Sequence, residues 1–130
     1  MQDAWKSLVA AARGAQRRAH APYSQFRVGA ALRDASGTVF LGANQENAAY
    51  PLGVCAERVA LAQWRADRGA PIVAIVIFTR TSTPTPPCGL CRDALLRFAA
   101  GAEICLATPT GRLGPWKAAD WLPSAPELVP

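Results

Sequence analysis

The 130-residue sequence has no apolar run that approaches the roughly 20 residues needed to cross a bilayer as a helix. Its first residues also lack the apolar core and the small-residue cleavage pattern of a secretory signal peptide. We therefore expect a cytoplasmic location and no membrane partner. Because cytoplasmic thiols stay reduced, the four cysteines are expected to bind metal or do chemistry rather than form disulfides.

Internal repeats and interdomain linkers are also missing, so residues 1–130 are expected to form one domain. Hydrophobic residues make up 51% of the chain, which favours a globular fold over disorder. Basic residues outnumber acidic ones and give a net charge of +5. They are scattered over predicted helix faces, without the clustering and interleaved aromatics of a nucleic-acid interface, so no nucleic-acid partner is expected.

Hydrophobic periodicity predicts alternating helices and strands. Apolar residues at helical spacing predict helices over residues 3–19, 54–68 and 89–100. Strands are predicted over 26–32, 38–41, 72–78 and 103–107, the first two forming a hairpin around the turn at 34–37. The proline-rich tail predicts only a short helical turn near 117–122. This order indicates an α/β fold in which helices pack on a mixed sheet.

Three cysteines stand at the predicted starts of two helices. Cys88 and Cys91 are spaced so that both thiols lie on one face of a first helical turn, and Cys55 begins the preceding helix. Helix N-termini stabilise thiolates. Three protein ligands with a fourth position open is the arrangement of catalytic zinc. His20 is distant in sequence and Cys105 is mid-strand, so neither is an obvious fourth ligand.

Glu57 follows Cys55 by two residues, and residues two apart in a regular helix point in nearly opposite directions. Cys55 is therefore expected at the helix boundary, where Glu57 can turn toward the metal site. A carboxylate there can take a proton from zinc-activated water and pass it on. Three thiolates and Zn²⁺ sum to one negative charge, which the adjacent Arg58 can offset by hydrogen bonding to the sulfurs.

Each of these features alone has a simpler interpretation. A single Cys-x-x-Cys pair is more often a redox motif or half of a structural zinc site. Cys55 alone would most often be a buried core thiol, and Glu57 alone a solvated helix residue. The order Cys-x-Glu followed by Pro-Cys-x-x-Cys is far more specific, since it is the signature of zinc-dependent deaminases of bases and nucleosides.

Three segments carry a wider resemblance, and they are residues 22–31 (PYSQFRVGAA), 44–58 (NQENAAYPLGVCAER) and 87–92 (PCGLCR). In this order and spacing they resemble the motifs of the small cytidine deaminases, over about residues 3–123. The resemblance implies a three-layer α/β/α fold with a mixed five-stranded sheet and helices on both faces. It also implies a zinc-dependent hydrolase of pyrimidine salvage, a nucleoside substrate and a homotetramer with shared active sites.

The resemblance also implies a role for each matching residue. Cys55, Cys88 and Cys91 would be the zinc ligands, and Glu57 would be the proton shuttle. The substrate-binding residues would be Asn44 and Glu46 at the ribose 3′-hydroxyl, Phe26 against the pyrimidine, the backbone of Ala56 at its edge, and Ala48 and Tyr50 at the sugar of a neighbouring subunit's ligand. Without it, Phe26 would be read as core, Asn44 and Glu46 as a solvated loop, and Tyr50 as a loop aromatic.

Three positions depart from the family pattern. Gln45 stands where an apolar residue is common, and Asp93 stands where the family has Gln. Pro126 occupies the position of a C-terminal Phe that packs on the base, a place that Trp116 or Trp121 would have to fill. These departures leave the metal chemistry intact and bear on base fit and substrate range.

The expected reaction is hydrolytic deamination of cytidine and 2′-deoxycytidine to the uridine forms, with release of ammonia. Glu46 favours a substrate with a neutral sugar, because a 5′-phosphate would want basic residues nearby. The alternatives are a deaminase of a modified cytosine nucleoside or nucleoside antibiotic, a non-catalytic zinc or nucleoside-binding module, and a nucleic-acid editing enzyme.

Overall fold

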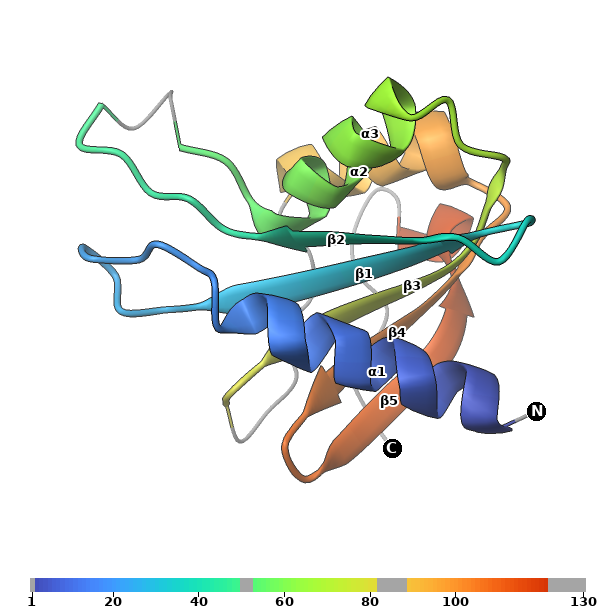
Figure 1. Cartoon of the computed structure of the whole chain (residues 1–130), viewed down its shortest axis with the longest axis horizontal. Helices are drawn as coiled ribbons and strands as arrows, with labels where there is room; N and C mark the ends of the chain where they lie inside the picture. The colour runs from blue at the N-terminus through green and yellow to red at the C-terminus, as the bar shows by residue number, and fades with distance from the viewer. Residues whose placement is uncertain (1, 50–52, 82–88, 122–130) are drawn as a thin grey trace.

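A single mixed sheet forms the centre of the computed structural model, which describes residues 2–49, 53–81 and 89–121 (Figure 1). Its strands are β1 (Val28–Asp34), β2 (Val39–Ala43), β3 (Ile72–Thr79), β4 (Glu103–Thr108) and β5 (Gly111–Lys117). The spatial order is β2-β1-β3-β4-β5, with β3 and β4 parallel and the other neighbours antiparallel. The predicted five-stranded mixed sheet is confirmed.

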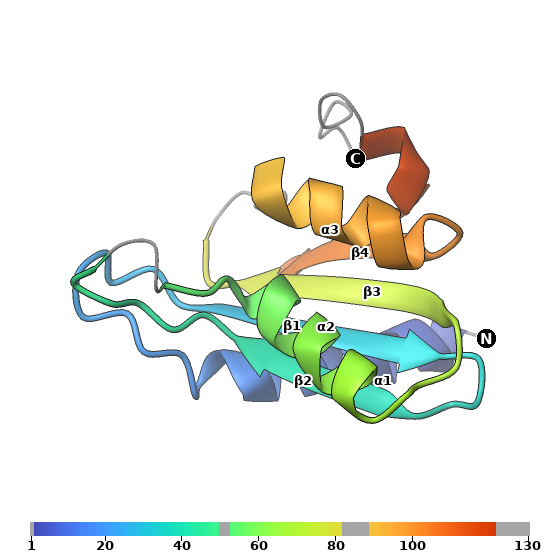
Figure 2. The same ribbon diagram turned by 90° about the horizontal axis from the view of Figure 1, so that it is seen from above.

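Helices cover both faces of this sheet, which confirms the three-layer prediction. Helix α1 (Gln2–Gln16) lies on one face, and α2 (Ala56–Ala66) and α3 (Gly89–Ala99) lie on the other (Figure 2). A short 3₁₀ helix, Ala118–Trp121, follows β5. The first turns of α2 and α3 lie at the same end of the sheet. Cys55, the N-cap of α2, and Cys91, in the first turn of α3, are therefore at that end. None of the described helices has the length and apolarity that a membrane span requires.

Two hydrophobic cores result, one on each side of the sheet. Leu8 and Ala12 of α1 pack against the inner face of β3 at Val76 and Phe78. The alternate residues of β3, Ile75 and Ile77, point to the other face and pack in the core formed with α2 and α3. Cys105 is fully buried on the α1 side, where burial raises the pKa of its thiol to about 11. Cys105 is therefore a packing residue on the face away from Cys55 and Cys91.

Two glycines let the helices approach the sheet, one on each face. A methyl group at Gly29 of β1 would overlap the carbonyl oxygen of Ala12 in α1. A methyl group at Gly42 of β2 would overlap the carbonyl oxygen of Ala56, at the start of α2. Close backbone approach is a common reason for glycine inside a strand. Gly42 thereby sets how deeply the first turn of α2 sits on the sheet.

The predicted boundaries need correction mainly at the C-terminal end. Strand β5 was not predicted by periodicity, because Gly111, Gly114 and Pro115 interrupt the pattern and most of the strand is exposed. Proline is tolerated in this position because β5 is an edge strand. On α3, Phe98 is 43% exposed, whereas Ala99 is buried. The first helix ends at Gln16, three residues before the predicted end at residue 19.

Candidate active site

Cys55 stands at the boundary of α2, as the sequence predicts. It is the N-cap residue, with extended backbone angles (φ −74°, ψ 155°), and its carbonyl oxygen accepts the first helical hydrogen bond, from Val59 N at 3.1 Å. Its side chain makes no capping bond and is half-buried. The extended conformation turns the thiol away from the regular helical positions, so Cys55 and Glu57 can face the same space.

Glu57 is buried in the first turn of α2, with only 4% of its surface exposed. Burial raises the pKa of Glu57 to about 7, with a smaller contribution in the same direction from the Cys55 thiol. Cys91, in the first turn of α3 and fully buried, hydrogen bonds with the Glu57 carboxyl group and acts in the opposite direction. The carboxyl group therefore lies between the thiols of two different helices.

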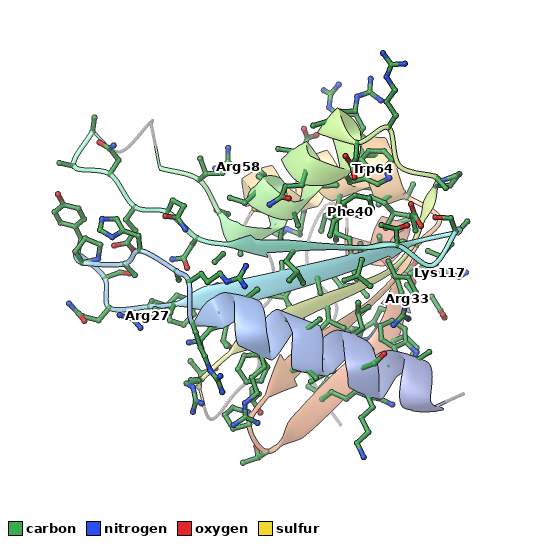
Figure 3. All side chains as sticks on the ribbon, viewed as in Figure 1. Arg27, Arg33, Phe40, Arg58, Trp64 and Lys117 are labelled. Carbon is green, nitrogen blue, oxygen red and sulfur yellow. The ribbon has the colours of Figure 1, made fainter. Side chains whose placement is uncertain are left out.

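Arg58 adds a positive charge to this cluster. Its Nη2 lies 3.9 Å from Cys55 Sγ, and hydrogen bonding to this thiol raises the pKa of Arg58. Cys91 also raises this pKa. Its Nε is buried with no hydrogen-bond partner among the described residues. Figure 3 shows Arg58 near the start of α2, with Trp64 toward the other end of the helix. One guanidinium thus interacts with a cysteine from each helix.

These contacts test whether the residues present suit a zinc ion. Two soft thiols meet beside a guanidinium that can balance thiolate charge, a donor set that zinc prefers. The third predicted ligand, Cys88, lies outside the described residues, and no three His, Cys, Asp or Glu side chains converge as a metal site within them. The described part of the site therefore fits the predicted metal with two of its three sulfurs.

Asn44 and Phe26 lie on adjoining loops at the end of the sheet where α2 begins. The side-chain amide of Asn44 donates to the Phe26 carbonyl oxygen at 2.8 Å, and its Oδ1 accepts from Val28 N at 2.8 Å. Phe26 is 37% exposed, so it is not the core residue that its type alone would suggest. Asn44 holds the backbone on both sides of the residue after Phe26, and so fixes where this ring is presented.

Glu46 organises the same loop from two residues further along. Its Oε1 accepts from the backbone N–H groups of Tyr23 and Ser24, at 3.0 and 3.1 Å, and its Oε2 accepts from the Ser24 hydroxyl. The Ser24 side chain is the main cause of the lowered pKa of Glu46. Sequence reasoning missed Ser24, although its place between Tyr23 and Phe26 in the first motif was a usable signal. Glu46 is thus an ionised anchor for the loop that carries Phe26.

The remaining predicted site positions are only partly described. Ala56, the first residue of α2, is fully buried, and Ala48, in the loop before this helix, is exposed. Tyr50 lies outside the described residues, as does Pro126.

Gln45 donates through Nε2 to the carbonyl oxygens of Arg18 and Ala43, each at 3.3 Å. Its side chain therefore lies against the end of α1 and the edge strand, so the departure at Gln45 has a structural use there.

Comparison with known proteins agrees with this geometry. Residues 3–107 match the family described as the cytidine and deoxycytidylate deaminase zinc-binding region. A cytidine deaminase of Halalkalibacterium halodurans is 43% identical over 107 residues, covering 82% of this chain and 76% of that protein. One from Sporosarcina psychrophila is 36% identical over 121 residues, covering 92% and 89%.

Solved structures give the same result for the fold. The crystal structure of cytidine deaminase from Burkholderia pseudomallei superposes with a TM-score of 0.84 at 41% sequence identity, covering 92% of this chain and 97% of that one. The structure of cytidine deaminase from Mycobacterium tuberculosis gives a TM-score of 0.79 at 33% identity, covering 93% and 95%. The chain belongs to the cytidine deaminase family, a family of zinc-dependent hydrolases.

Proposed function

We propose that the chain hydrolyses cytidine and 2′-deoxycytidine to the corresponding uridines and ammonia, with Glu57 as the proton shuttle. Cys55, Cys88 and Cys91 would hold the zinc ion. When bound, zinc activates the attacking water by lowering its pKa to about 7. The water oxygen would add to C4 of the ring while Glu57 takes a proton from this water and delivers it to N3. Glu57 would then move the second proton from the new hydroxyl group to the exocyclic amine, so that the C4–N bond breaks, C4=O forms and ammonia leaves.

The observation that carries this proposal is the burial of Glu57 between Cys55 and Cys91. A carboxyl group with a pKa of about 7 exchanges a proton readily at neutral pH, as a shuttle must in both halves of the reaction. A solvated helix residue would keep a pKa near the ordinary value of about 4.3. A zinc site with a purely structural role would have no use for this carboxyl group.

The loop held by Asn44 and Glu46 supports the choice of a neutral nucleoside. Phe26 is presented by this loop with its ring partly exposed, which suits packing against a pyrimidine. Glu46 is ionised and would repel a phosphorylated sugar while accepting hydrogen bonds from ribose hydroxyls. In this proposal Asn44 and Glu46 bind the ribose 3′-hydroxyl and the backbone of Ala56 reads the base edge.

We further propose that active sites are completed by neighbouring copies in a homotetramer, with Ala48 and Tyr50 reaching a neighbour's ligand. Exposed aromatic side chains support association. Tyr23 and Phe98 are 66% and 43% exposed, and Phe98 lines an apolar hollow of about 260 Å³ between α2 and α3. Apolar surface of this kind is typical of subunit contacts. Light scattering on the zinc-loaded protein tests this, and a monomer with full activity would contradict it.

The direct test of the chemistry is Glu57→Gln, measured by ammonia release from cytidine with zinc content determined on the same sample. The amide keeps the shape of the side chain but cannot carry the proton, so kcat should fall by at least about 10²- to 10⁴-fold while zinc stays bound. Glu103→Gln is the matched control, because Glu103 begins β4 away from this site. Full turnover in Glu57→Gln, or none in the wild type, would overturn the proposal.

A further inference from the structure

A basic groove lies on the face of the sheet opposite Glu57. It runs between α1 and the β4–β5 hairpin and encloses about 500 Å³. Three cationic side chains line it: Lys6 and Arg13 from α1 and Arg112 from β5. Lys6 and Arg13 come from near the N-terminus and Arg112 from near the C-terminus, so the sequence alone does not show that they converge.

No carboxylate of the described residues balances the charge in this groove. Within residues 2–49, 53–81 and 89–121, no acidic side chain lines it. Among the residues that the structure describes, one ion pair is found, between Arg97 and Asp93 on α3. Three cations that share one concave surface without a carboxylate create a local positive potential, and concave low-dielectric walls strengthen it. The groove therefore favours an anionic occupant.

The spacing of the three cationic side chains, and the fixed position of one of them, indicate which class of anion the groove suits. Lys6 and Arg13 are seven residues apart on one side of α1, about 10 Å along the helix axis. This distance suits an extended chain of phosphates better than a single compact anion. The Arg13 guanidinium already lies 5.7 Å from the centroid of the Phe78 ring, which limits its freedom before any ligand arrives.

The hairpin opposite α1 adds neutral hydrogen-bonding groups. Thr108 and Thr110 both line the groove, and their hydroxyl oxygens are 3.1 Å apart across the turn into β5. Hydroxyls beside cations are typical partners of phosphate oxygens. Val9 and Phe78 supply an apolar wall that could meet the uncharged part of a ligand.

We propose that this groove binds the polyphosphate chain of a nucleoside triphosphate or diphosphate. Lys6 and Arg13 would contact phosphates from the α1 wall, and Arg112 from the β5 wall. Such a site would be separate from the nucleoside site at Glu57, whose ionised neighbour Glu46 disfavours phosphate. The enzyme would then bind a phosphorylated nucleotide without deaminating it at that position.

The test is calorimetric titration of the zinc-loaded full chain with UTP, ATP and inorganic tripolyphosphate, at about 0.15 M ionic strength. Excess Mg²⁺ prevents the phosphates from chelating zinc. We expect one nucleotide bound per subunit, with the amide signals of Thr110 and Gly111 shifting in NMR spectra. Arg13→Gln/Arg112→Gln should weaken binding by about tenfold or more, since charge-assisted hydrogen bonds are each worth more than a factor of ten.

The matched control is Arg65→Gln/Arg97→Gln, which removes the same charge from the α2 and α3 side of the sheet. It should bind the nucleotides as the wild type does, and both double variants should keep zinc and cytidine turnover. Equal binding by the two double variants, or no binding of any of the three ligands, would overturn the proposal. Oligouridylate is titrated as a fourth ligand, and its binding alone would also overturn the proposal, because it would make the groove a contact for single-stranded RNA.

Discussion

Asn44 holds Phe26 through a pair of 2.8 Å hydrogen bonds, one to the Phe26 carbonyl oxygen and one from the N–H group of Val28. The family resemblance assigns this side chain to ribose binding, and the structure shows that it also positions the loop that carries Phe26. Both of its polar atoms are already engaged with backbone, so a change at Asn44 moves the ring as well as any sugar contact. This coupling decides how a mutation here should be interpreted.

Asn44→Ala should lower kcat/KM for cytidine by about 10- to 100-fold, because small misplacements of a binding surface are costly. Asn44→Asp is the informative second variant, since it keeps the acceptor for Val28 N but loses the donor to Phe26. It should fall between the wild type and the alanine variant. Asn47→Ala removes a neighbouring loop amide that accepts from Ala49 N and serves as the control. Identical kinetics for all four proteins would remove the positioning role.

Arg58 is expected to influence the metal through the sulfurs. Arg58→Gln removes the positive charge 3.9 Å from Cys55 Sγ and should weaken zinc binding by about 10- to 100-fold, the usual effect of losing an outer partner of a ligand. Competition with a coloured chelator measures this directly. Arg65→Gln, on the same helix but away from the cysteines, should retain wild-type affinity. If Arg58→Gln binds zinc as tightly as Arg65→Gln does, the charge on Arg58 does not stabilise the thiolates.

The two glycines that admit the helices give separable predictions. Gly29→Ala and Gly42→Ala each force backbone apart and should cost about 1–3 kcal/mol of unfolding free energy. Only Gly42→Ala displaces the first turn of α2, so it should lower zinc affinity as well, while Gly29→Ala should not. Gly14→Ala is the control, because Gly14 has open space around it in α1, and it should stabilise by about 0.5–1 kcal/mol. Urea unfolding and chelator competition provide both readouts.

Some parts of this structure can be predicted from helix periodicity and residue chemistry, and others cannot. The position of Cys55 at the boundary of α2 was predicted from helix geometry once the chemistry had assigned Cys55 and Glu57 to one metal site, because residues two apart cannot share a face of a regular helix. Strand β5 could not be found in this way, since Gly114 and Pro115 hide an edge strand that needs no buried alternation. The contact of Glu46 with Ser24 joins residues 22 positions apart, so periodicity could not reveal it, and only the place of Ser24 in the first motif pointed to it.

Asp34 makes stability depend on pH on the acid side. This buried carboxylate accepts hydrogen bonds from Ser36, Thr38 and Ala70, and the Ser36 side chain is the main cause of its lowered pKa. Because the folded pKa lies below the unfolded value of about 3.9, the unfolded chain binds more protons in that range. The contribution of Asp34 is therefore complete above about pH 4 to 5 and is lost as pH falls through the lower, folded value.

The check is urea unfolding of the wild type and Asp34→Asn between about pH 7 and pH 3. The stability difference between the two proteins should be largest near neutral pH and shrink on acidification. Zinc loss at low pH affects both proteins alike, so the difference isolates Asp34. A difference that does not change with pH would show that the charge on Asp34 contributes nothing.

Gln45 and Gln63 both cover the free edge of β2. Gln45 donates to the carbonyl oxygen of Ala43 and Gln63 to that of Leu41, at 3.3 and 3.2 Å, on the side of β2 that none of the described strands pairs. Unpaired edge groups invite pairing with another chain, and capping them is a protection. Gln45→Leu and Gln63→Leu should therefore each increase light scattering on storage. Each variant should keep the preference between cytidine and deoxycytidine within about twofold of the wild type, as expected for surface changes. A changed preference in Gln45→Leu would place this side chain in contact with the base after all.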